Sequence, residues 1–213
     1  MKFLFSFLLF FLISCTADAQ VPNFISPETL NDVMIVTDPI PAQAFYGVLE
    51  NFPHTYEIHS TVPFHLFTQI LVPDIETSRN NISGIIIKLP ETEGRVTEVV
   101  TLDAKNSEWH SEFEAMSGDS YRKGPAFEKD LEAGTYRIEV HTPDNIEKYV
   151  LLIGSEEEKS IGYFARIKRL IAIKAFFEKS PISIIESPLV YIPLFVILFV
   201  GGGIWYIRRR QRR

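Results

Sequence analysis

The sequence predicts an all-β fold, an antiparallel and jelly-roll-like β-sandwich ectodomain, followed by a juxtamembrane helix and one transmembrane helix. Two strongly apolar segments, 3–13 and 189–207, flank a polar and acidic middle region in this chain of 213 residues. Within that middle region, short segments of alternating apolar and polar residues recur at intervals of roughly 8–12 residues, which is typical of sandwiches. The acidic middle is therefore expected to fold as a domain, and the two apolar ends to meet the membrane.

Residues 1–19 are expected to be a signal peptide. Lys2 precedes an apolar run of 11 residues, FLFSFLLFFLI, and the small residues of Ala17-Asp18-Ala19 favour cleavage before Gln20. An alternative stays open, because Leu12-Ile13-Ser14-Cys15 resembles the lipobox of bacterial lipoproteins, in which the cysteine carries a lipid. Cys15 is the only cysteine in the chain, so the domain is expected to lack disulfides.

Residues 20–43 are expected to be an extended segment, and residues 44–155 to form the sandwich. In GTYRIEVHT the residues Tyr136, Ile138 and Val140 alternate with polar residues, as in a strand with one buried face. Similar patterns predict strands at 44–49, 55–60, 64–72, 83–89, 95–102, 134–142 and 148–154.

Residues 156–187 are expected to form an acidic hinge and a basic amphipathic helix. On a helix, five apolar residues would gather on one side, while Arg166 and Arg169 leave it. These apolar residues are Tyr163, Phe164, Ile167, Leu170 and Ile171. Such a helix could rest on the outer membrane surface or pack beneath the sandwich, and the sequence does not choose between the two.

Residues 188–207 predict the transmembrane helix. Its 19 uncharged residues, 189–207, are enough to cross a hydrocarbon core about 30 Å thick. The basic tail 208–213 is expected to stay in the cytoplasm, which with a cleaved signal gives a type I, single-pass protein of the cell membrane. The arginines of this topology signal are Arg208, Arg209, Arg210, Arg212 and Arg213.

Charge excludes one class of partner. Residues 20–160 contain 24 acidic and 10 basic residues, a net charge of −14. Such a domain repels phosphates, so nucleic acid is not expected to bind. The expected partners are membrane lipid, through the C-terminal helix, and another envelope protein or a glycan.

Residues 118–155 carry a family resemblance. Leu131, Ala133, Gly134, Thr135 and Tyr136 are similar to the strand that precedes the last one in prepeptidase C-terminal-type domains, and Tyr149, Leu151 and Gly154 are similar to the last strand. More closely, the chain looks like single-pass bacterial surface proteins built on that module. The resemblance implies a β-sandwich and an extracytoplasmic location, and it assigns no activity to these residues. Gly134 is expected in a turn with positive φ, and the two tyrosines in the core with their hydroxyls at its edge.

Residues that could carry chemistry are few. The histidines are His54, His59, His65, His110 and His141. Positions 59 and 65 would share a face of one strand, but Pro63 interrupts it. No spacing typical of a zinc site or of a catalytic nucleophile occurs, and no cofactor is expected. Glu108, Glu112, Glu114 and Asp119 are weak calcium candidates, without the spacing of a known calcium loop.

These observations predict a membrane-anchored extracytoplasmic binding or accessory module that is not itself an enzyme. The alternative is an accessory subunit of a membrane or envelope enzyme complex, or an enzyme whose site no motif reveals. The alternative would require polar residues from distant strands to converge in one site.

Overall fold

The computed structural model describes residues 21–91, 94–156 and 162–212. The predicted signal peptide, its cleavage site and Cys15 lie outside these residues. The chain divides into two compact units. We call Gln20–Glu114 with Asp119–Lys159 the sheet domain, and the remainder, which includes Ala115–Gly118 and Ser160–Arg213, the helical unit.

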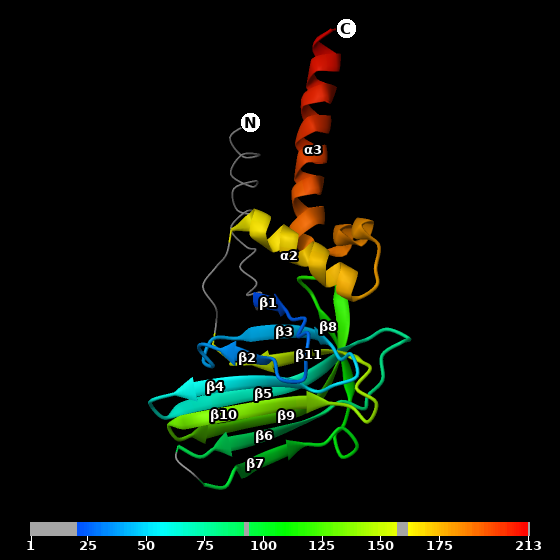
Figure 1. Cartoon of the computed structure of the whole chain (residues 1–213). Helices are drawn as coiled ribbons and strands as arrows, with labels where there is room; N and C mark the ends of the chain where they lie inside the picture. Colours follow the sequence, from blue (N-terminus) through cyan, green and yellow to red (C-terminus); the bar gives the residue numbers. More distant parts are fainter. Residues whose placement is uncertain (1–20, 92–93, 157–161, 213) are drawn as a thin grey trace. The chain divides into compact units, whose positions relative to one another are not determined.

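The sheet domain consists of two β-sheets (Figure 1). The six-stranded sheet contains, in spatial order, β1 (Val21–Phe24), β3 (Gln43–Val48), β11 (Lys148–Ile153), β5 (Phe64–Pro73), β9 (Asp119–Leu131) and β8 (His110–Glu114). The five-stranded sheet contains β2 (Val33–Val36), β4 (His54–Ser60), β10 (Gly134–His141), β6 (Ser83–Leu89) and β7 (Thr97–Leu102). All the strands expected from the alternating patterns are present, with ends shifted by at most two residues.

Both sheets are mixed, so the expectation of a purely antiparallel fold was wrong. β1 pairs with β3 in parallel, and β2 pairs with β4 in parallel. The reason lies in the connections, because the first four strands alternate between the two sheets. β1 and β2 fall in the segment 20–43, which was expected to be merely extended.

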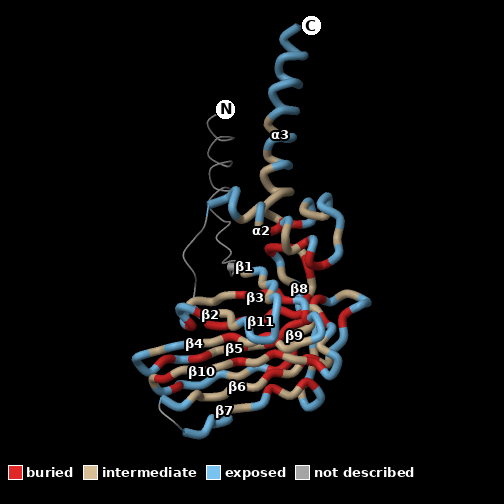
Figure 2. Tube along the Cα trace, in the orientation of Figure 1, coloured by how far each residue is buried: buried red, intermediate tan, exposed pale blue. Residues whose placement is uncertain are grey.

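One hydrophobic core takes residues from both sheets. β10 alternates buried and half-buried residues along its whole length, so that Tyr136, Ile138 and Val140 point into the core. Phe45, Leu66 and Leu151 of the six-stranded sheet belong to the same core. Figure 2 shows this alternation as red and tan segments along the strands.

The opposite face of the six-stranded sheet is also apolar. Ala44, Tyr46, Val150 and Leu152 alternate with core residues and are nevertheless buried. Phe24 stacks on Tyr46 with ring centroids 5.0 Å apart. Strand β11 therefore reads as a nearly continuous apolar run, as strands buried on both faces do.

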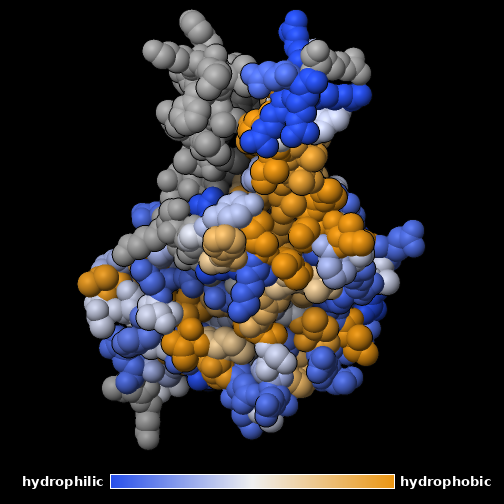
Figure 3. Space-filling view, turned by 90° about the horizontal axis from the view of Figure 1, so that it is seen from above, coloured by the Kyte–Doolittle hydropathy of each residue, from blue (hydrophilic) through white to orange (hydrophobic). Residues whose placement is uncertain are grey.

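The helical unit contains α2 (Tyr163–Phe176), the 3₁₀ turn η1 (Pro181–Glu186) and α3 (Pro188–Gln211). The Ser187 hydroxyl accepts a hydrogen bond from Leu189 N, and Pro188 opens the first turn of α3, both common at helix starts. Among the described residues, α3 is the one helix long and apolar enough to cross a membrane. Figure 3, a view from above, shows hydrophobic residues along α3 and hydrophilic residues at its arginine-rich end. That end contains Arg208, Arg209, Arg210 and Arg212. Arg213 lies outside the described residues.

The faces of α2 differ from the expectation. Leu170 is buried, whereas Phe164 is 85% exposed, so the five apolar residues do not share one side. Lys174 is buried on the same face as Leu170, and its ammonium group lies 3.2 Å from the Glu186 carboxylate. The ion pair compensates the charge and so allows lysine at a buried position.

Candidate functional site

The segment from Glu28 to Ile40 forms an edge of the five-stranded sheet. Before β2, the Asp32 carboxylate accepts hydrogen bonds from Glu28 N (2.7 Å) and Thr29 N (2.9 Å). Both bonds lower the pKa of Asp32, and the bond from Thr29 N has the larger effect. After β2, Asp38 accepts a hydrogen bond from Ile40 N (3.1 Å). Polar turns therefore fix both ends of this strand.

Strand β2 presents an apolar edge. It pairs with β4 on one side and ends the sheet order, so no described strand pairs with its other side. Met34 and Val36 point to the core, whereas Ile35 is 64% exposed. Leu30 and Ile40 are exposed beside it in the sequence. Such an edge offers unpaired backbone N–H and C=O groups next to apolar side chains.

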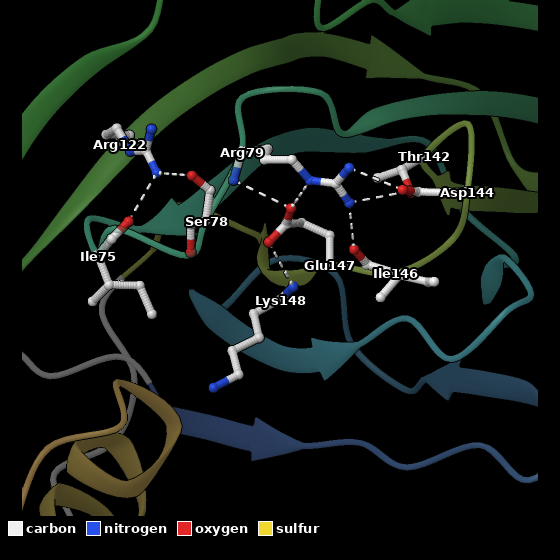
Figure 4. A network of polar contacts seen from close by, with 9 residues as sticks. All are labelled: Ile75, Ser78, Arg79, Arg122, Thr142, Asp144, Ile146, Glu147 and Lys148. Carbon is white, nitrogen blue, oxygen red and sulfur yellow. Dashed lines mark hydrogen bonds and ion pairs between the residues drawn. The ribbon is translucent and has the colours of Figure 1, made fainter.

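A polar network joins the loop after β5 to the loop between β10 and β11 (Figure 4). Arg79 donates from Nε to Glu147 (2.9 Å), from both terminal nitrogens to Asp144 (2.9 and 3.2 Å) and to Ile146 O (2.7 Å). The Arg79 guanidinium lowers the pKa of Asp144 to about 2. Since the guanidinium donates from all three nitrogens, Arg79 acts as a clamp between loops rather than as a reactive group.

A second polar group lies inside the core. His54 Nδ1 and Tyr56 Oη each lie 2.8 Å from Tyr149 Oη. His54 Nε2 has no hydrogen-bond partner among the described residues. Burial lowers the pKa of His54 to about 4, so the ring is neutral in the folded protein near neutral pH. The hydroxyl of Tyr149 thus lies within the core, not at its edge as expected, whereas that of Tyr136 donates to Glu132 O (2.9 Å).

The neutral His54 predicts a loss of stability in acid. Below pH 6.5 the unfolded chain protonates this histidine, but the folded chain does not until the pH approaches 4. The free energy of unfolding should therefore fall by about 2 kcal/mol between pH 7 and pH 5 through this residue alone. Urea unfolding at the two pH values measures it, and His54→Gln, which cannot titrate, should remove this part of the loss.

His65 supplies a control of opposite sign. Its ring lies 2.8 Å from Asp130 and 3.1 Å from Glu128, and hydrogen bonds to these carboxylates raise its pKa. Below the pKa that His65 has in the unfolded chain, this histidine raises the free energy of unfolding. That contribution is lost as the pH rises through the higher pKa that His65 has in the folded chain. His65→Gln should therefore steepen the acid loss. Equal pH profiles for wild type, His54→Gln and His65→Gln would contradict both assignments.

The remaining predicted positions do not converge. His59 lies on β4, where its Nδ1 is 2.9 Å from the Thr135 hydroxyl oxygen, so it is in the other sheet from His65. Glu108 is exposed, Glu112 pairs with Lys123 (2.7 Å), and Glu114 lies opposite Asp119 in the β8–β9 pair. Within the described part of the chain, no three His, Cys, Asp or Glu side chains lie together as metal ligands would. Calcium binding stays a prediction.

The comparisons with known proteins give weak likenesses. No protein-family model matches the chain, and no curated protein matches it. The pre-peptidase C-terminal domain of the collagenase from Bacillus anthracis aligns with a TM-score of 0.35 and 9% identity, over 61% of this chain and 97% of the domain. The Eiger TNF from S. frugiperda aligns with a TM-score of 0.23 and 15% identity, over 49% of this chain and 65% of that one. The pre-peptidase domain is a weak structural neighbour, and membership in that family stays a prediction.

Proposed function

We propose that the chain is a membrane-anchored extracytoplasmic binding module that has no catalytic activity of its own. In this proposal α3 crosses the membrane, the arginine-rich end stays in the cytoplasm and the two sheets form a β-sandwich outside. The apolar length of α3 and the net charge of the region before it support this arrangement. The core shared between the two sheets supports the sandwich.

The observation that carries the binding function is the apolar edge at β2. An extended segment of a partner protein can add a strand there, with backbone hydrogen bonds giving affinity and side chains giving specificity. Ile35 and Val33 would flank the added strand on its outer face. A protein fits this edge better than a glycan, because a glycan has no regular row of N–H and C=O groups to match it.

Photocrosslinking in the native membrane tests the proposal. A benzophenone side chain at position 35 of the full-length chain should give one discrete adduct with a protein. The same group at Val62, which is 60% exposed in the turn between β4 and β5, is the matched control. The adduct at 35 should disappear when Val33→Lys places a charge on the edge.

Two results would contradict the edge as the binding site. Equal yields of adduct from positions 35 and 62 would show that the partner does not prefer the β2 edge. An adduct at position 35 that persists in Val33→Lys would show a contact that does not depend on this edge. Unchanged thermal unfolding of Val33→Lys excludes loss of fold as the cause.

A further inference from the structure

Pro193 leaves an unsatisfied carbonyl at the start of α3, and α2 satisfies it. In a regular helix the C=O of Leu189 accepts from the N–H of residue 193, but proline has no N–H. The Tyr163 hydroxyl donates to Leu189 O instead, at 2.8 Å. An unpaired carbonyl is costly near hydrocarbon, so this hydrogen bond stabilises the start of α3. It also connects the first residue of α2 to the first turn of α3.

A second attachment holds the other end of α2. Lys174 in its last turn and Lys179 just beyond it lie 3.2 and 3.4 Å from the same Glu186 oxygen. The hydrogen bond from Lys174 lowers the pKa of Glu186. Glu186 is separated from α3 by the cap residue Ser187 alone. Both ends of α2 are therefore fastened to the chain where α3 begins.

The short collar made by α2 and η1 exposes large apolar side chains. Phe164 is 85% exposed and Ile182 is 78% exposed. Tyr163, Ile171 and Ile185 are between 43% and 48% exposed. Along α2, Phe164, Lys168 and Ile171 lie on one exposed side. The helix contains no acidic residue, whereas Arg166, Lys168, Arg169 and Lys174 are basic, and Lys168 is the exposed one of these four.

We propose that this collar enters the interfacial layer of the membrane that α3 crosses, on the side of the start of α3. Phe164 and Ile182 would reach the boundary between headgroups and acyl chains, and Lys168, on the same exposed side of α2 as Phe164, would lie at the lipid phosphates. Lipid is the occupant because the collar is continuous with the apolar surface of α3 and its charge complements anionic headgroups. The inference rests on the proposed function only in requiring that α3 spans the membrane.

Spin labels in full-length protein in nanodiscs test the proposal. Cys15→Ser gives a cysteine-free background, in which Phe164→Cys, Ile182→Cys, Leu198→Cys and Val62→Cys are labelled one at a time. The ratio of oxygen to nickel-complex accessibility reports depth. Labels at 164 and 182 should give a ratio several-fold higher than at 62 and lower than at 198, and the difference should grow with phosphatidylglycerol.

The arms separate two kinds of failure. If the label at 198 lies in hydrocarbon while the labels at 164 and 182 give the same accessibility ratio as the label at 62, α3 spans the membrane but the collar stays in water. Only this inference is then overturned. If 198 is itself open to the nickel complex, the span and the proposed function fall as well. Tyr163→Phe adds a positioning test, since loss of its hydrogen bond should lower the ratio at 164 and leave 198 unchanged.

Discussion

Gly154→Ala is expected to destabilise the sheet domain by about 3 kcal/mol. Gly154 follows β11 with φ of +82°, which costs a non-glycine residue about 1–2 kcal/mol. A β-carbon there would lie 2.2 Å from Pro41 O and 2.6 Å from Ile40 O. Since both atoms belong to backbone, overpacking should add about 1–3 kcal/mol. Urea unfolding followed by circular dichroism measures the change.

The backbone around Gly154 cannot easily relax the clash. Gly154 N donates to Phe67 O (2.9 Å), and Ala42 N donates to Glu156 O (2.8 Å). Gly162→Ala is the matched control, because a methyl group there meets no atom within 4 Å, and it should change stability by less than about 0.5 kcal/mol. Equal effects of the two substitutions would show that the segment around Pro41 is not held against Gly154.

Arg79→Met is expected to lower the free energy of unfolding by about 2–3 kcal/mol. The Glu147 side chain is only 6% exposed, and without the guanidinium it keeps the backbone donors of Arg79 and Lys148 but loses its opposite charge. A buried acceptor deprived of its charged partner costs about 1–3 kcal/mol. Two loops distant in sequence would also lose their connection through Asp144 and Ile146.

A surface pair and a double variant control the Arg79 experiment. Lys123→Met removes a partly exposed ion pair with Glu112 and should cost less than about 1 kcal/mol. Glu147→Gln combined with Arg79→Met should recover part of the loss, because the unpaired charge is then absent. If the double variant is as unstable as the sum of the two single variants, Arg79 and Glu147 are not coupled and the clamp is not what holds the loops.

Local patterns account for the strands that have one buried face. β4, β6 and β10 alternate clearly, and each lies where its pattern places it. β9 was not predicted, and Gly124 and Pro125, residues that are typical of turns, fall in its middle. The ring of Trp109 fills the space beside Gly124, 2.4 Å from where a β-carbon would lie, so glycine serves packing there rather than a turn.

Short edge strands and parallel pairing carry no local signal. β1 and β2 have four residues each, and β8 exposes nearly all of HSEFE. The parallel partner of β2 lies about twenty residues away, across a strand of the other sheet. A sequence pattern shows which face of a strand is buried, but it does not show which strand lies beside it.

The polar networks were equally hidden because their members are far apart in sequence. His54 and Tyr149 are separated by 95 residues, and Arg79 and Asp144 by 65. The hydrogen bond from Tyr163 to Leu189 had one local signal in the sequence. Pro193 has no N–H, so the carbonyl of Leu189, four residues earlier, lacks its usual helical donor. The sequence shows that a donor is needed there, and only the fold shows which residue provides it.

We proposed that α3 anchors the sheet domain outside the cell, and labelling of single cysteines in intact cells tests this orientation. In the Cys15→Ser background, Val62→Cys lies in the sheet domain and Gln211→Cys at the arginine-rich end of α3. With a membrane-impermeant maleimide and a sealed cytoplasmic membrane, position 62 should react at once and position 211 only after permeabilisation. Reaction at 211 but not at 62 in sealed cells would show the opposite orientation and contradict the proposal.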